Sequence, residues 1–218
     1  MRFDIITIFP KIFDSYLNES LFKRAREKKL IDVRVHNLRD FTDDRHNKVD
    51  DRPFGGGPGM VIKVQPVEKA ISRLRSQAAK KPSSRSKTRI ILFSTRGKKF
   101  DAKTAKRLSK YKQLIFICGR YEGVDERVAE HIADEEISMG DYVLSGGELP
   151  ALIVTEAVSR FIPGFLGKEE SLEEVNGSFP TYTRPEVFIS GKKKTWVVPK
   201  VLLSGNHKKI EEWRREVQ

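Results

Sequence analysis

The chain has 218 residues, 38% of them hydrophobic and 33% charged, with a formal net charge of +12 at pH 7 and a pI of about 9.7. This length allows a substantial core and predicts one domain with an appendage or two small domains. The charge points to a polyanionic partner, and nucleic acid is favoured over membrane because no apolar run approaches the roughly 20 residues that span a bilayer. The N-terminus lacks a signal-peptide layout and Cys118 is the only cysteine, so we expect a cytoplasmic protein without an intrachain disulfide.

The N-terminal elements indicate a βαβ unit. An apolar run over 3–9 predicts a buried strand, helical spacing of apolar residues predicts a helix over 12–29, and alternation over 31–38 predicts a second strand. A strand, a helix and a strand within about 35 residues imply a parallel sheet.

Residues 39–60 break this pattern and predict a long loop rich in Asp, Arg and Gly. Such loops are usually functional or disordered, and Gly55-Gly-Gly-Pro-Gly-Met60 favours a shaped backbone surface. Its glycine spacing fits neither a phosphate-binding loop nor the dinucleotide fingerprint. His46 has four Asp nearby but no second His or Cys, which disfavours a transition-metal site and leaves weak Mg²⁺ association through carboxylates.

The middle of the chain continues the α/β pattern. Its expected elements are a helix over 65–79, a basic connector over 80–88, a strand over 89–94, a helix from Asp101, a strand over 114–118 and a short helix over 124–132. Ligands in open parallel sheets bind at the carboxyl ends of strands. We therefore expect the segments 94–97, 119–123 and 137–150 to lie together.

The segment 137–150 contains three glycines and two acids but no Lys or Arg, and it opens into an apolar run that predicts a helix over 149–158 with Pro150 in its first turn. Glycine lets the backbone approach a ligand, and a helix N-terminus offers unpaired N–H groups. The residues leave a backbone-lined pocket and a plain strand–turn–helix corner as alternatives. A serine hydrolase built on Ser145 is excluded because Val143 stands where the nucleophile elbow needs glycine.

Charge is spread unevenly along the chain. Residues 73–112 contain fifteen Lys or Arg and one acid, whereas residues 128–159 contain seven Asp or Glu and no Lys or Arg. This contrast favours a protein that grips a polyanion beside an acidic pocket, with solvated faces of opposite sign as the alternative. Residues 161–181 have the composition of a linker, and we expect Asn206 to cap a basic C-terminal helix.

The longer motifs follow one another in order along nearly the whole chain. They are Phe9-Pro10, Arg45-His46, Asp50-Asp51-Arg52-Pro53, Gly55-Gly-Gly-Pro-Gly-Met60, Gln65-Pro66, Cys118-Gly-Arg-Tyr-Glu-Gly123, Asp125-Glu-Arg127, Gly140-Asp-Tyr-Val-Leu-Ser-Gly-Gly-Glu-Leu-Pro150, Ser159-Arg-Phe-Ile-Pro-Gly164, Tyr182-Thr-Arg-Pro-Glu186 and Leu202-Leu-Ser-Gly-Asn-His207. In these motifs the chain resembles the bacterial tRNA (guanine-N1)-methyltransferase family, the TrmD type of the SPOUT superfamily.

The resemblance implies an α/β fold with a SPOUT-type parallel sheet and a C-terminal trefoil knot over 1–160, an interdomain linker over 161–181 and a small, truncated helical tRNA-binding domain over 182–218. It implies methylation of N1 of guanosine 37 in tRNA by a homodimer with its active site at the subunit interface. S-adenosylmethionine would bind in the knot. Its implied contacts are Phe93, Ser94, Thr95, Gly119, Tyr121, Glu122, Gly123, Met139, Gly140, Asp141, Tyr142, Val143, Leu144, Gly146, Gly147 and Pro150.

The same resemblance implies roles in substrate binding and catalysis. Arg160 matches a family arginine that would stabilise charge on guanine O6, with Mg²⁺ as a suggested helper. The family's proposed base, a linker Asp, is replaced by Val175, so Glu173 or Glu174 would take that role. This replacement also leaves open a cofactor-binding, RNA-binding protein with weakened or lost catalysis. The implied substrate contacts are Asp50, Arg52, Gly55, Gly56, Gly57, Pro58, Gly59, Met60, Ser171 and Arg184.

Overall fold

The structure, a computed structural model, describes residues 1–79, 88–166, 178–191 and 194–217. The chain divides into two compact units, Met1–Gly167 and Lys168–Gln218. No helix in the described part of the chain is long and apolar enough to cross a membrane.

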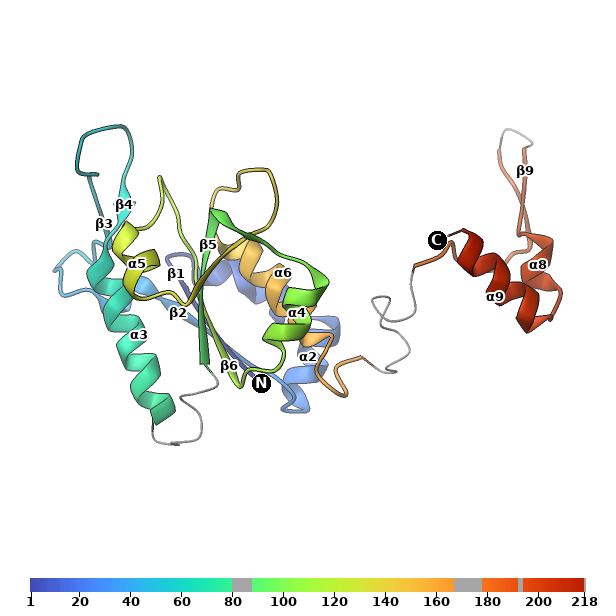
Figure 1. Ribbon diagram of the computed structural model, residues 1–218, viewed down its shortest axis with the longest axis horizontal. Helices are drawn as coiled ribbons and strands as arrows, with labels where there is room; N and C mark the ends of the chain where they lie inside the picture. Colours follow the sequence, from blue (N-terminus) through green and yellow to red (C-terminus); the bar gives the residue numbers. More distant parts are fainter. Residues whose placement is uncertain (80–87, 167–177, 192–193, 218) are drawn as a thin grey trace. The chain divides into compact units, whose positions relative to one another are not determined.

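The first unit is built on a five-stranded sheet (Figure 1) with the strand order β2-β1-β6-β5-β7. Its strands are β1 (Arg2–Thr7), β2 (Asp32–Asn37), β5 (Thr88–Lys99), β6 (Gln113–Ile117) and β7 (Glu135–Ser138). Every neighbouring pair is parallel. The parallel sheet predicted from the first βαβ unit is therefore confirmed.

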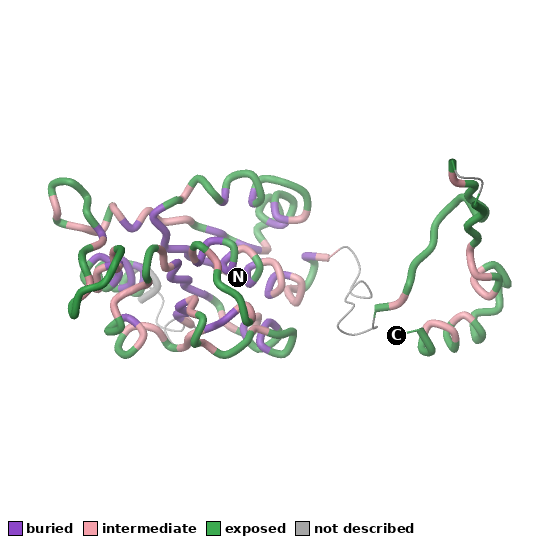
Figure 2. The backbone as a smooth tube through the Cα atoms, turned by 90° about the horizontal axis from the view of Figure 1, so that it is seen from above, coloured by how far each residue is buried: buried purple, intermediate pink, exposed green. Residues whose placement is uncertain are grey.

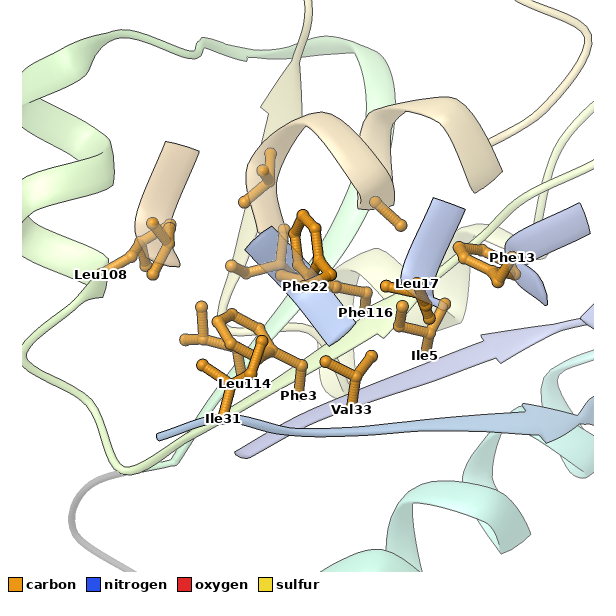
Figure 3. Close-up of a cluster of buried hydrophobic side chains, with 14 of the residues drawn as sticks. Phe3, Ile5, Phe13, Leu17, Phe22, Ile31, Val33, Leu108, Leu114 and Phe116 are labelled. Atoms are coloured by element: carbon orange, nitrogen blue, oxygen red, sulfur yellow. The ribbon is translucent and has the colours of Figure 1, made fainter. Parts of the chain in front are cut away.

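Helices cover both faces of this sheet. One face carries α1 (Asp14–Leu17), α2 (Ser20–Glu27), α4 (Ala102–Leu108) and α6 (Glu148–Ser159); the other carries α3 (Val64–Ala79) and α5 (Glu126–His131). Alternate strand side chains enter the two cores, so that Phe3 and Ile5 pack under α6 (Figure 3) while Ile6 packs under α3. The central strands β1 and β6 are buried over nearly their whole length, which explains their continuous apolar runs, and Figure 2 draws buried residues in purple.

The single helix predicted over 12–29 is wrong, because the segment forms η1 (Pro10–Phe13), α1 and α2. The Asn18 side chain donates to the Asp14 carbonyl at 2.7 Å, the acceptor that a continuing helix would offer to the Asn18 N–H. Ser20 then adopts a φ of 47°, which an α-helix does not accommodate.

Two other segments are more ordered than predicted. The strand expected over 89–94 continues to Lys99, with a register shift against β7 between Phe93 and Lys98. Gly97 fits there because a Cβ would lie 2.6 Å from the Glu136 carbonyl carbon. The loop expected over 39–60 contains η2 (Leu38–Phe41) and β3 (Asp50–Asp51), and β3 pairs with β4 (Val61–Ile62) to close a hairpin.

A buried polar cluster lies toward the amino ends of the central strands. Asp4 is fully buried and accepts hydrogen bonds of 2.7 Å from Arg2, His36 and Gln113. Burial raises the pKa of Asp4, but the hydrogen bonds from His36, Arg2 and Gln113 outweigh it and hold the pKa below its usual value. Asp4 is therefore a buried carboxylate that remains ionised.

The second unit contains a hairpin that the sequence analysis did not predict. Strands β8 (Val187–Ile189) and β9 (Thr195–Val197) pair antiparallel, and α8 (Lys200–Leu203) and α9 (His207–Glu216) follow. Asn206 Oδ1 accepts from the Lys209 N–H at 3.2 Å, which confirms the predicted cap of the last helix.

Candidate functional site

A cavity of about 560 Å³ opens beside the carboxyl ends of the strands. Its wall is built from residues that follow Leu92 in β5, from the loop after β6 and from the loop after β7. The structure thus brings together the three segments predicted from the sequence.

Most of the residues that the resemblance implied as cofactor contacts line this cavity. Fourteen of the sixteen do so, and only Gly140 and Asp141 do not. Gly140 shapes the turn, with a φ of 144° and the Tyr142 ring 2.7 Å from the place of a Cβ. Asp141 instead forms an ion pair of 2.5 Å with Lys99. Further lining residues, which the resemblance did not imply as cofactor contacts, are Arg96, Arg120, Val124, Glu126, Ile137, Ser138 and Ser145.

The loop before α6 is locked onto the loop after β6. Gly147 donates from its N–H to the Gly119 carbonyl at 3.0 Å, and Gly146 forms an antiparallel bridge with Arg120. A Cβ on Gly147 would lie 2.6 Å from the Cys118 Cα, so only glycine allows this approach of two backbones. The Ser-Gly-Gly turn predicted to form a pocket therefore also joins two of its walls.

Glu148, the first residue of α6, is buried at this junction. The Thr7 hydroxyl donates to its carboxylate at 2.6 Å and Arg120 Nε donates to it at 2.9 Å. Arg120 also lies over the Phe9 ring, 4.9 Å from its centroid. A carboxylate in the first helical turn is favoured by the helix dipole, and an acid directly after Gly-Gly was the one sequence signal for this role.

The charges lining the cavity leave one carboxylate without a cation. Arg96 pairs with Glu126 at 2.5 Å on the rim, and Arg120 pairs with Glu148 behind the wall. Glu122 is exposed, and its carboxylate has no hydrogen-bond or ion-pair partner within the part of the chain that the structure describes. Tyr121 beside it adopts a φ of 61°. A side chain held in this strained region is typical of a functional loop.

The β3–β4 hairpin is bonded to the same loop. Glu122 N–H donates to the Met60 carbonyl at 3.1 Å, Ile62 N–H donates to Gly123 at 3.0 Å, and Asp125 N–H donates to Ile62 at 2.9 Å. The hairpin turn is built from four glycines with φ between 79° and 115°, and Phe54 at its start is fully exposed.

The residues implied as substrate contacts fall in different places. This hairpin contains Asp50, Arg52, Gly55, Gly56, Gly57, Pro58, Gly59 and Met60. The backbone at Gly59 lies directly against the Glu122 side chain, which leaves no room for a Cβ. Arg184 belongs to the second unit, and Ser171 lies outside the described residues.

The residues implied in catalysis are only partly described. Arg160 caps the end of α6, is partly buried, and donates from its N–H to the Glu156 carbonyl at 3.1 Å. Glu173 and Glu174 lie outside the described residues. Over 1–79, 88–166, 178–191 and 194–217, no group of three or more His, Cys, Asp or Glu is arranged to hold a metal ion. Burial raises the pKa of the Cys118 thiol well above its usual value, which disfavours a nucleophilic thiolate.

Comparison with known proteins identifies relatives over the full length. Residues 1–218 match the family described as tRNA (Guanine-1)-methyltransferase TrmD. A tRNA (guanine-N(1)-)-methyltransferase of Clostridioides difficile (strain 630) is 49% identical over 222 residues, which cover 99% of this chain and 91% of that protein. The corresponding protein of Geotalea uraniireducens (strain Rf4) is 51% identical, with coverage of 99% and 84%. The crystal structure of a tRNA (m1G37) methyltransferase from Aquifex aeolicus is similar with a TM-score of 0.79 and 40% identity, covering 98% of this chain and 87% of that one.

Proposed function

Because this chain belongs to the tRNA (guanine-N1)-methyltransferase family of the TrmD type, we propose that it methylates N1 of guanosine 37 in tRNA with S-adenosylmethionine as methyl donor. The observation that carries the proposal is the cavity walled by three strand-end loops, with the β3–β4 hairpin bonded to one of them. Transfer of a methyl group between two bound molecules requires that they be held side by side, and a cofactor site that shares a wall with a substrate loop meets this requirement.

The cavity suits S-adenosylmethionine in size and charge. Its volume lies within the roughly 300–1,000 Å³ of small-molecule sites, and a Cβ at Gly146 would collide with Arg120 and Glu148, so the backbone itself forms the floor. The unpaired Glu122 carboxylate suits a cationic ligand. When bound, S-adenosylmethionine supplies an electrophilic methyl group on a positively charged sulfur.

The reaction also needs proton transfer and charge stabilisation. Guanine N1 carries a proton at neutral pH, so a base must remove it, and negative charge then develops on O6. We assign the removal of the N1 proton to the carboxylate of Glu173 or Glu174. The Arg160 guanidinium would stabilise the negative charge on O6. No protein site for Mg²⁺ is assigned, because the described residues offer no three-ligand group, and no step above depends on the ion.

A homodimer is part of the proposal. One side of α6 carries Leu149, Ile153 and Glu156, which are spaced by about one helical turn. The apolar side chains of Leu149 and Ile153 are exposed. The Tyr16 hydroxyl donates to the Glu156 carboxylate and joins α1 to this side of α6. Ile12, in η1, which also contacts α6, is exposed as well. An apolar face of this kind beside the cavity supports an interface between two copies.

The trefoil knot and the cytoplasmic location remain predictions within this proposal. The knot is supported by the path of the loop after β7. In the sheet, β7 and β6 lie on opposite sides of β5, and the loop that leaves β7 is bonded through Gly146 and Gly147 to the loop after β6. The location follows from the proposed substrate.

The test is methyl transfer to unmodified tRNA, with a matched tRNA carrying adenosine at position 37 as control. We expect product at N1 of guanosine 37 and none in the control. Cofactor binding without any product would mean that the chain binds cofactor and RNA but lacks catalysis. In a second arm, Glu173→Gln combined with Glu174→Gln should abolish transfer and leave cofactor affinity unchanged; full activity would exclude both as the base.

A further inference from the structure

The β8–β9 hairpin exposes large apolar side chains on both of its faces. Phe188 is 48% exposed and Trp196 60%, and Ile189 and Val197 are more exposed still. The hairpin pairs only with itself among the described strands. An isolated two-stranded ribbon is marginal in water, and apolar surface of this kind usually marks an interaction site.

The aromatic pair on this hairpin is preformed. Phe188 and Trp196 are directly opposite in register, with ring centroids 5.3 Å apart and planes 39° apart. Backbone hydrogen bonds close the ribbon at both ends, from Val198 to Glu186 at 3.0 Å and from Ser190 to Lys194 at 2.9 Å. Because side chains alternate, the two rings share one face and the aliphatic residues occupy the other.

The charge around the hairpin indicates which partner this face takes. Residues 178–218 contain nine Lys or Arg against four Glu. Lys194 precedes β9, Lys200 begins α8, and both are exposed. Exposed rings beside cations are the features with which proteins hold single-stranded nucleic acid, by stacking bases and neutralising phosphates. An apolar protein partner would need no such charge.

We propose that Phe188 and Trp196 form a stacking platform for an unpaired nucleotide of the RNA substrate, with Lys194 contacting an adjacent phosphate. Bases within a duplex stack on each other and offer no free face, so the platform takes a base from a single-stranded loop. The identification of this RNA as tRNA rests on the proposed function.

Variants at Trp196 separate stacking from charge. Trp196→Leu should weaken tRNA binding about 5- to 100-fold without changing the dependence of affinity on salt, whereas Trp196→Phe should retain most of it. Lys194→Ala should reduce the salt slope by about one. Val197→Ala, on the opposite face, is the matched control and should bind as the wild type. Equal affinity of Trp196→Leu and wild type would overturn the platform.

A direct signal does not depend on how the variants at positions 194, 196 and 197 fold. In a full-length Trp213→Phe background, binding of a short single-stranded RNA should quench the fluorescence of Trp196, and an unquenched signal at saturation would refute stacking. Sedimentation provides the competing outcome: if Trp196→Leu loses RNA affinity only by dissociating the dimer, the face is an interface between chains. Quenching without methyl transfer by the wild type would overturn the proposed function alone; transfer without quenching would overturn the platform alone.

Discussion

Replacing Glu148 by glutamine tests whether the buried carboxylate holds the pocket together. The side chain of Glu148 is 1% exposed and that of its partner Arg120 is 21% exposed, so their pairing is weakly screened by solvent. Breaking a buried pair from one side costs about 3–5 kcal/mol, and a charge-assisted hydrogen bond alone contributes about 1.5–3 kcal/mol. Because glutamine can still accept from Thr7, we expect a loss of about 3 kcal/mol, or roughly 6–12 °C in Tm for a chain of this size.

The assay is thermal unfolding of the full chain, followed by calorimetric titration with S-adenosylmethionine. Glu126→Gln is the control, because it removes the same charge from a pair on the cavity rim whose side chains are 65% and 53% exposed. Exposed pairs contribute about 0–1 kcal/mol, so the control should shift Tm by no more than a few degrees. Equal shifts in the two variants would refute the argument that Glu148 fixes the loop after β6 against α6.

The remaining predictions concern the turn, the buried cluster and the basic region. Gly147→Ala should cost about 1–3 kcal/mol of stability and weaken cofactor binding, because its Cβ would meet the Cys118 backbone. Gly191→Ala, where nothing lies within 4 Å of the place of a Cβ, is the control and should change neither the Tm nor the cofactor affinity. Asp4→Asn should destabilise the protein at pH 7. Because the pKa of Asp4 is lowered, its ionised carboxylate contributes stability at pH values above its usual pKa of 3.8, and this contribution is lost as the pH falls. In urea unfolding, the free energies of unfolding of variant and wild type should converge in acid, and a constant difference would contradict this. Lys98→Gln combined with Lys99→Gln should weaken tRNA binding and flatten its salt dependence, and an unchanged slope would place the RNA elsewhere.

Local patterns predicted those parts of the fold that local forces determine. The apolar runs of β1 and β6 are buried on both faces and predicted buried strands, and the order strand, helix, strand predicted that the sheet is parallel. The Asp101 carboxylate caps α4 by accepting a hydrogen bond from the Thr104 N–H at 2.7 Å, and that helix start was predicted. The meeting of three loops at one edge followed from the parallel topology.

Features that depend on tertiary pairing escaped prediction. Residues 95–99 are mostly polar and carry a glycine, so they suggested a loop, yet pairing with β7 holds them in β5. Glu148 directly precedes the helix predicted over 149–158, but its position did not indicate that two distant donors would bury its carboxylate. The short strands β8 and β9 flank a run of lysines, which concealed the alternation of a hairpin.

The loop after β6 serves two neighbours at once. Its Gly119 carbonyl binds the turn before α6, while Glu122 and Gly123 bind the β3–β4 hairpin. A ligand that displaces this loop must therefore either shift the hairpin with it or break these hydrogen bonds, and coupling between binding sites is reciprocal. For the methyl donor and the RNA of the proposed function, the factor by which one changes the affinity for the other is therefore the same in both directions. Measured on one ligand, this factor fixes the other.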